Sequence, residues 1–283
     1  MALNVREFFD KNTFTMTYIV YDKETKDSII IDPVLDFDNA SGRFSYESVN
    51  TLIDYIQKNK LTPLAILETH AHADHITSAT HLKNIFKGIP IGISSEIVKV
   101  QDVFNRVFND ESSENDFDLL LSDNQIIKFG AIEVKIIHTP GHTPACSSFL
   151  IGNKVFTGDA LFMPDFGTGR CDFPSGSSSD LYHSVHEKLY TLADETEIFT
   201  GHDYMPGGRE LQFKTTIGKS KKENIHIKEQ TTCDEFVSYR DERDKTLAAP
   251  KLLLPSIQVN IKAGKLPQAD KNGKSYLKLP ITI

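Results

Sequence analysis

The sequence predicts an α+β or α/β protein in which two β-sheets pack face to face and helices cover their outer faces, in four layers of αββα order. Two observations predict this arrangement. Strand and helix patterns alternate along the chain in mixed order, and several neighbouring strand patterns are separated only by a short turn, as in a hairpin. A chain of 283 residues with 18 Phe and 9 Tyr is long enough to bury such a core.

The first elements are two strands, a helix and a third strand. Residues 13–21 alternate apolar and polar β-formers, and residues 28–33 form a short apolar run that a proline ends, with residues 23–26 as the turn between them. Residues 46–58 carry apolar side chains at helical spacing, which indicates an amphipathic helix. Residues 64–67 form a short apolar run typical of a buried strand.

A polar turn leads from that strand into a second predicted helix over residues 75–86, with Asp74 placed to cap its N-terminus. More strands and one more helix are predicted further along the chain. Strand patterns return at residues 126–129, 132–137, 147–151, 155–157 and 197–200, and residues 180–192 predict a helix.

Two regions depart from this alternation. Residues 109–123 form a polar, acidic insertion that we expect to be an exposed loop. After Tyr204 the sequence becomes irregular and helical, with scattered prolines. We therefore divide the chain into a main domain, residues 1–204, and a C-terminal extension, residues 205–283, packed on the same body. The apolar residues of the extension fit either its own core or a partner chain, so a homo-oligomer is one expectation.

Composition narrows the classes of function. The net charge of -8 disfavours nucleic acid as a partner, since proteins that bind it usually present a basic surface. No apolar stretch is long enough for a membrane span, and no secretory signal pattern opens the chain. The three cysteines are far apart and form no CxxC pair, which predicts neither disulfides nor a cysteine metal site. We expect a cytoplasmic protein.

Histidine and aspartate residues follow the ends of four predicted strands. Neutral imidazole and carboxylate are good ligands for zinc, iron and manganese, and loops at strand ends are where α/β folds build sites. The candidate metal ligands are His70, His72, Asp74, His75, His142, Asp159 and His202. His70 and His72 are two residues apart, which places both rings on one side of an extended segment.

One histidine after a strand is usually structural, but seven such residues in this order predict a metal site. Glycines at 141, 158 and 201 lie beside three of the candidates, where they permit tight turns and close approach of the backbone. The alternative from a different functional class is a metal-binding scaffold that does not catalyse a reaction. It is disfavoured because all seven positions are filled.

The segment Thr69-His70-Ala71-His72-Ala73-Asp74-His75 resembles the metallo-β-lactamase superfamily, and the resemblance extends over about residues 13–204. Within it, the chain is most similar to two glutathione-linked families, the hydroxyacylglutathione hydrolases (glyoxalase II) and the persulfide dioxygenases. Three stretches resemble the dioxygenases: residues 158–173, which carry GxGRxDF, the following helix at residues 181–189, and Gly201-His202-Asp203-Tyr204. The acidic insertion and the long tail resemble a longer bacterial subgroup.

The resemblance to the dioxygenases implies one Fe(II) per chain, held by His70, His142 and Asp159, and no catalytic side chain beyond the metal centre. His72, Asp74, His75 and His202 would then lie behind the ligands. The implied reaction oxidises glutathione persulfide, or a related low-molecular-weight persulfide, with O2 to sulfite. The alternative is a thiolester hydrolase like glyoxalase II, in which the same residues hold two Zn, Fe or Mn ions bridged by Asp159. Ligand identity does not separate these two families.

Two residues are predicted to bind the substrate. Arg170 suits the glutathione carboxylate, because a guanidinium matches a carboxylate with two parallel hydrogen bonds. The alternative for Arg170 is an ion pair with a neighbouring Asp. Tyr204 has a phenol that suits the same ligand, with packing in the core as its alternative. Arg209 is a weaker candidate for anchoring the substrate.

Overall fold

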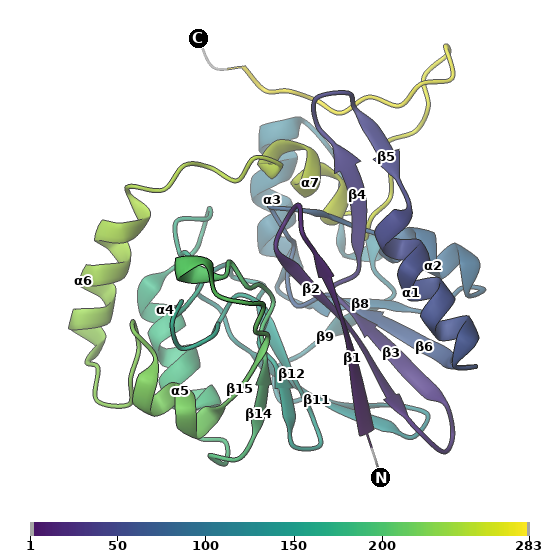
Figure 1. Cartoon of the computed structure of the whole chain (residues 1–283). Helices are drawn as coiled ribbons and strands as arrows, with labels where there is room; N and C mark the ends of the chain where they lie inside the picture. The colour runs from purple at the N-terminus through teal and green to yellow at the C-terminus, as the bar shows by residue number, and fades with distance from the viewer. Residues whose placement is uncertain (1–2, 282–283) are drawn as a thin grey trace.

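The structure, a computed structural model, describes residues 3–281 and has the four predicted layers (Figure 1). Two six-stranded sheets pack against each other, and a helical layer covers each outer face. The first sheet has the order β1-β2-β3-β6-β8-β9 and the second β10-β11-β12-β13-β14-β15. The longest helices of residues 3–281 have 12 residues, which is too short to cross a bilayer.

The first sheet consists of β1 (Leu3–Asp10), β2 (Thr15–Asp22), β3 (Asp27–Ile31), β6 (Thr62–Leu67), β8 (Ile91–Ser94) and β9 (Leu119–Leu121). The second consists of β10 (Ile126–Phe129), β11 (Ile132–His138), β12 (Ser147–Ile151), β13 (Lys154–Phe156), β14 (Glu197–Phe199) and β15 (Lys214–Thr216). A small third sheet joins β4 (Val34–Asp38), β5 (Arg43–Ser45) and β7 (Ile76–Thr77).

Both faces of the first sheet are buried, which explains why its central strands are runs of apolar residues. Successive side chains of a strand point to opposite faces. Thus Ile19 and Ile30 face the helices, whereas Tyr18 and Ile29 face the second sheet. Three separate apolar cores result, one between the sheets and one under each helical layer.

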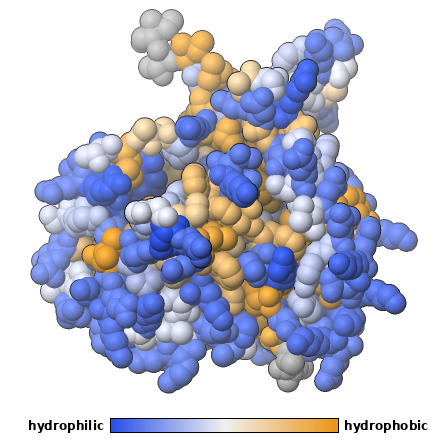
Figure 2. All heavy atoms as spheres, in the orientation of Figure 1, coloured by the Kyte–Doolittle hydropathy of each residue, from blue (hydrophilic) through white to orange (hydrophobic). Residues whose placement is uncertain are grey.

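The helical layer on the first sheet contains α1 (Glu47–Lys58), α2 (Ala79–Ile85), α3 (Ile97–Phe108) and α7 (Leu253–Asn260). The layer on the second contains α4 (Ser178–His183), which continues as a π-helical turn over Ser184–Leu189, together with α5 (Ile217–Glu223) and α6 (Cys233–Asp244). Figure 1 places these two groups on opposite sides of the molecule. Figure 2 shows the molecule in the same orientation, and on this face apolar residues gather in the middle and are bordered by hydrophilic ones.

The predicted helix over residues 75–86 is wrong in its first turn. Ile76 and Thr77 form β7, which pairs with β4, and the helix begins only at Ala79. Asp74 does not cap it, because its carboxylate lies 3.2 Å from the Nδ1 of His75. The backbone N–H of Thr77 donates to Asn260 of the distant helix α7, so a tertiary contact overrides the local helical pattern.

The acidic insertion at residues 109–123 is only partly an exposed loop. It ends in β9, which pairs in parallel with β8 and buries Leu121. The extension after Tyr204 is irregular and helical as predicted, and it supplies β15 at the edge of the second sheet as well as α7 in the core of the first. The boundary at residue 204 stays a prediction. All three cysteines are free thiols.

Candidate metal centre

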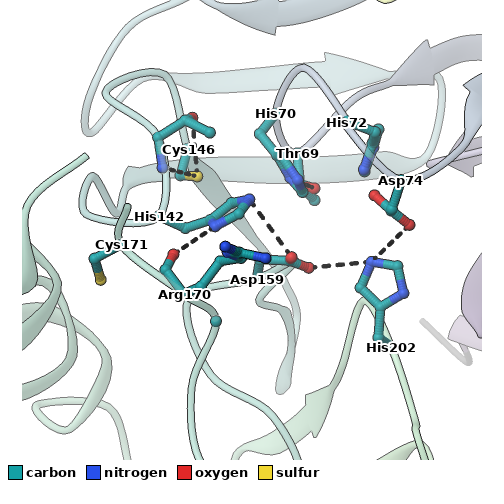
Figure 3. A network of polar contacts seen from close by, with 12 residues as sticks. Thr69, His70, His72, Asp74, His142, Cys146, Asp159, Arg170, Cys171 and His202 are labelled. Carbon is teal, nitrogen blue, oxygen red and sulfur yellow. Dashed lines mark hydrogen bonds and ion pairs between the residues drawn. The ribbon is translucent and has the colours of Figure 1, made fainter. Parts of the chain in front are cut away.

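The seven predicted ligands meet where strands of both sheets end. Figure 3 labels all of them except His75, whose Nδ1 lies 3.2 Å from Asp74 Oδ2. The loop with His70, His72, Asp74 and His75 follows β6 of the first sheet. The other three lie in loops of the second sheet, after β11, β13 and β14. The site is therefore built across the interface between the sheets, and neither sheet alone forms it.

The ligand loop after β6 keeps the alternation of an extended chain. Ala71 and Ala73 point into the apolar core beneath the helices, while His70 and His72 on the other side point to the site. Asp32, at the end of β3, holds the beginning of this loop. Its carboxylate accepts hydrogen bonds from the backbone N–H of Thr69 at 2.7 Å and from the Thr69 hydroxyl at 2.8 Å.

His70, His142 and Asp159 form one compact group, with one ligand atom from each within 4.8 Å of the others. In both histidine rings, Nδ1 points away from the group and lies within hydrogen-bond distance of a protein oxygen. His70 Nδ1 is 2.9 Å from the Thr69 hydroxyl, and His142 Nδ1 is 2.6 Å from the carbonyl oxygen of Arg170. The other nitrogens face inward, and His142 Nε2 is 3.6 Å from Asp159 Oδ2. This fixes each ring in the orientation that a metal ligand requires.

His72, Asp74 and His202 form a second compact group by the same measure. His202 Nε2 is 3.5 Å from Asp74 Oδ2 and 3.4 Å from Asp159 Oδ1, so Asp159 lies between the two groups. His72 Nε2 faces Asp32 at 3.1 Å and Glu68 at 3.4 Å, which directs its Nδ1 inward.

The buried atoms without hydrogen-bond partners indicate what fits this site. They include His70 Nε2, His72 Nδ1, His75 Nε2 and Asp159 Oδ1. A buried polar atom that lacks a partner costs about 1–3 kcal/mol, so four such atoms in one site are unfavourable unless something binds them. Imidazole nitrogens and a carboxylate oxygen are donors for a divalent metal ion, and a metal at this place would satisfy them.

The electrostatics suit a cation. Burial lowers the pKa of His70 well below its ordinary value, and the neighbouring His72 and His142 lower it further. His70 is therefore neutral, the form that binds metals. Burial alone would raise the pKa of Asp74, but the charges of His202 and His75 outweigh it and hold this pKa well below its usual range. Asp74 is thus a carboxylate at neutral pH.

The glycines beside the ligands have the predicted role. Gly158 has φ +50°, and a Cβ atom there would lie 2.6 Å from the Thr69 hydroxyl oxygen. At Gly201 a Cβ atom would lie 2.9 Å from the backbone of Gly158. A side chain at either position would push apart the loops that carry His70, Asp159 and His202.

A cavity of about 410 Å³ opens at His142, Asp159 and Asp74. Phe162, Phe166 and Tyr204 line one part of it with aromatic rings. The guanidinium-bearing residues Arg170, Arg240 and Arg243 line another, and His226 lies beside them. The cavity thus joins an apolar wall to a cationic one directly next to the candidate metal ligands.

Arg170 lies at this cavity as predicted, but the alternative ion pair is also formed. Its Nε and Nη2 bond to the two carboxylate oxygens of Asp172 at 2.5 Å, and its Nη1 donates to the Ala248 carbonyl at 2.7 Å. Arg243 also lines the cavity, and among residues 3–281 no carboxylate is paired with it. Of the two, Arg243 is the more available for an anion.

Tyr204 also lines the cavity, where its ring stacks on Phe166 at 4.7 Å between centroids. Arg209 does not line it. Its guanidinium is held by the carboxylates of Asp165 and Asp203, with four hydrogen bonds between 2.5 and 3.0 Å. Arg209 is therefore engaged in fixing the loop after β14.

Several residues of the site are not among the candidates predicted from the sequence. Asp32 directly follows an apolar strand pattern, as the ligand loop does. Its carboxylate at the end of a strand was therefore a signal in the sequence that Asp32 could belong to the site. Glu68, adjacent to the motif, is likewise buried against His72. For Arg240, Arg243 and Asn260 the sequence carries no comparable signal, because only the packing of α6 and α7 brings them to the site.

Comparison with known proteins identifies related chains. The sequence model of the Metallo-beta-lactamase superfamily matches residues 12–202. "Glyoxylase B2" of Dictyostelium discoideum is 44% identical over 282 residues, which cover 98% of this chain and 96% of that one. "Persulfide dioxygenase ETHE1, mitochondrial" of Mus musculus is 29% identical over 262 residues, covering 92% and 88%. The crystal structure of ETHE1 from Myxococcus xanthus has a TM-score of 0.75 at 29% identity, covering 93% of this chain and 100% of that one.

Proposed function

The chain belongs to the metallo-beta-lactamase superfamily, and within it we propose that the protein is a persulfide dioxygenase that oxidises glutathione persulfide, or a related small persulfide, to sulfite. The group His70, His142 and Asp159 carries this proposal. Two histidines and one carboxylate on one face of a metal are typical of non-haem Fe(II) oxygenases, because they leave other coordination positions open. The similarity to ETHE1 proteins over most of the chain supports it.

In this proposal His70, His142 and Asp159 would hold one Fe(II). The chemistry that this metal would supply when bound is the activation of O2 beside the persulfide. The protein keeps the two rings in place through the Thr69 hydroxyl and the Arg170 carbonyl oxygen, so little reorganisation is needed at the moment of reaction. Overall, the persulfide, O2 and one water give glutathione and sulfite: the S–S bond breaks and the outer sulfur gains three oxygens.

The cavity supports a small anionic thiol as the substrate. Glutathione carries two carboxylates and one ammonium group, and the side chains of Arg243 and Arg170 face the cavity. The Arg243 guanidinium donates to the Thr246 hydroxyl at 3.3 Å and has no carboxylate partner among residues 3–281, so it is suited to one carboxylate of the substrate. The aromatic wall with Phe162 and Tyr204 would exclude water around the sulfur. A binding pocket that orients the substrate next to the metal converts the encounter into a unimolecular step.

A specific observation favours a second candidate, a two-metal thiolester hydrolase. The group His72, Asp74 and His202 is also compact, and the inward nitrogens of His72 and His75 have no partner. A second metal would satisfy them, and two metals would lower the pKa of a bridging water. The spacing of this group matches that of the first, since His202 Nε2 lies 3.5 Å from Asp74 Oδ2 and His142 Nε2 lies 3.6 Å from Asp159 Oδ2. The number of metals bound per chain and the need for O2 therefore separate the two candidates.

Oxygen consumption tests the proposal. Protein purified anaerobically and reconstituted with Fe(II) should consume O2 when glutathione persulfide is added, with sulfite formed in equal amount. The His142→Ala variant should lose this activity. Uptake no greater than that of His142→Ala, together with cleavage of a glutathione thiolester without O2, would reject the dioxygenase and favour the hydrolase.

A further inference from the structure

The C-terminal helix α7 contacts the ligand loop through one buried side chain. Asn260, only 3% exposed, makes two hydrogen bonds to the backbone of this loop and a third to Thr77 in the adjoining strand β7. We propose that Asn260 is a positioning residue that holds the ligand loop in its metal-binding shape, which gives the C-terminal extension a direct part in the metal centre. The inference rests on the metal-binding role proposed for this loop, which carries His70 of the first group and His72 and Asp74 of the second, but not on the reaction that the metal supports.

The hydrogen bonds of Asn260 match the chemistry of an amide. Its Oδ1 accepts from the backbone N–H of Thr77 at 2.9 Å. Its Nδ2 donates to the carbonyl oxygens of His72 and His75, both at 2.7 Å. The two carbonyls flank Asp74, so the amide closes the part of the loop that carries three candidate ligands. Aspartate has no proton for the two carbonyls at neutral pH, so it cannot replace this residue.

Residues 70–75 need such support because they lie between β6 and β7, outside both strands. Loop backbone without a ladder depends on side chains for its hydrogen bonds. Asn260 is also connected to the His72 side chain indirectly, through Thr77 and Glu68. Thr77, whose N–H it accepts, donates its hydroxyl to Glu68 at 2.5 Å, and Glu68 lies 3.4 Å from His72 Nε2.

The helix that presents Asn260 is itself firmly held. Ile257, Val259 and Ile261 are fully buried, in the same apolar core as Ala71 and Ala73 of the ligand loop. Just beyond the helix, the Thr80 hydroxyl donates to the Ala263 carbonyl at 2.7 Å. The helix and the loop thus share one core, and the amide is directed from a rigid element, as a precise positioning contact requires.

Gln258 provides a matched control on the same helix. It is also a buried amide, at 5% exposure, with three hydrogen bonds, one to the Leu254 carbonyl and two to the backbone of Lys278. None of its bonds reaches the ligand loop. Loss of Gln258 therefore reports what a broken amide on α7 costs in stability, separately from any effect on the metal.

The test is Co(II) binding to the full-length apo-protein, measured by its visible absorption bands and by competition with a chelator. Asn260→Asp and Asn260→Ser should weaken Co(II) binding about 10- to 100-fold, the usual effect of losing a residue that supports metal ligands. They should also shift the bands, because the ligand geometry changes. Gln258→Ala should change the Co(II) affinity less than about twofold. It should lower the stability of the protein about as much as the Asn260 replacements do.

Three results would overturn the inference. The first is unchanged Co(II) affinity and spectra in both Asn260 variants. The second is an equal loss of affinity in Gln258→Ala, which would reflect general destabilisation. The third is failure of both Asn260 variants to fold while Gln258→Ala folds, which would make the role purely structural. A wild-type protein that binds Co(II) but oxidises no persulfide would reject the proposed reaction and leave this test intact.

Discussion

Asp32 offers a sharp test of how the site is built. The residue is 2% exposed and has φ +49°, and its carboxylate receives three hydrogen bonds. Both Thr69 N–H and His72 Nε2 lie next to its Oδ1, while the Thr69 hydroxyl lies next to Oδ2. Asp32 therefore orients the ligand loop and one histidine at the same time.

The replacements Asp32→Ala and Asp32→Asn should differ strongly. Alanine leaves the buried Thr69 N–H without a partner and leaves His72 Nε2 with only the more distant Glu68 carboxylate, at about 1–3 kcal/mol each. The left-handed backbone adds about 1 kcal/mol for alanine, so we expect a total loss of roughly 3–7 kcal/mol. Asparagine tolerates this backbone conformation and can keep both bonds at its oxygen. It loses the assistance of the charge and the acceptor for the Thr69 hydroxyl, which would face the amide NH2 group instead of Oδ2, at a total of about 1–2 kcal/mol.

Urea unfolding of the apo-proteins measures both values, and titration with Co(II) measures the consequence for the site. We expect metal binding about tenfold weaker in Asp32→Asn and up to about 100-fold weaker in Asp32→Ala. If Asp32→Ala were within about 1 kcal/mol of the wild type, or if both variants lost the same stability, the hydrogen bonds would not be the cause and this reasoning would fail.

Three further predictions follow from the same geometry. Gly158→Ala should cost at least about 2 kcal/mol in urea unfolding, because its Cβ would lie 2.6 Å from the Thr69 hydroxyl; an unchanged midpoint would refute the close approach. Burial, and then Arg240 and Arg243, lower the pKa of His226 to about 4. In the unfolded chain His226 has the ordinary pKa of about 6.5 and therefore binds a proton more readily than in the folded protein. The contribution of neutral His226 to the free energy of unfolding should be fully present above about pH 6.5 and should be lost as the pH falls to about 4. His226→Gln should remove this part of the decline, and an identical decline in the variant would contradict it. Arg243→Ala should raise KM for the persulfide several-fold and leave kcat nearly unchanged, and an unaltered KM would exclude its contact with substrate.

The predictable part of the structure is the part encoded locally. Central strands such as β3 and β6 are apolar on both faces and were predicted within a few residues. The spacing of His70, His72 and Asp74 in one segment indicated a metal site because an extended chain puts alternate side chains on one side. Each remaining candidate follows a strand pattern, and in the structure the ends of those strands meet the ligand loop after β6 across the interface between the two sheets.

The unpredictable part depends on contacts between distant segments. β7 has the sequence of a helix start, and becomes a strand because β4 and Asn260 take its hydrogen bonds. Leu119–Leu121 stands in an acidic stretch and joins the sheet only because β8 offers a parallel edge. Arg243 reaches the cavity through the placement of α6, which no local pattern reveals.

In the proposed reaction one metal at His70, His142 and Asp159 is sufficient for oxygen-dependent persulfide chemistry. An anaerobic titration of the apo-protein with Fe(II), in which each sample is assayed for persulfide-dependent O2 uptake, measures this requirement. The proposal predicts that activity rises linearly and reaches a plateau at one Fe(II) per chain. Activity that appears only with a second equivalent of metal, and that cleaves a thiolester without consuming O2, would contradict it.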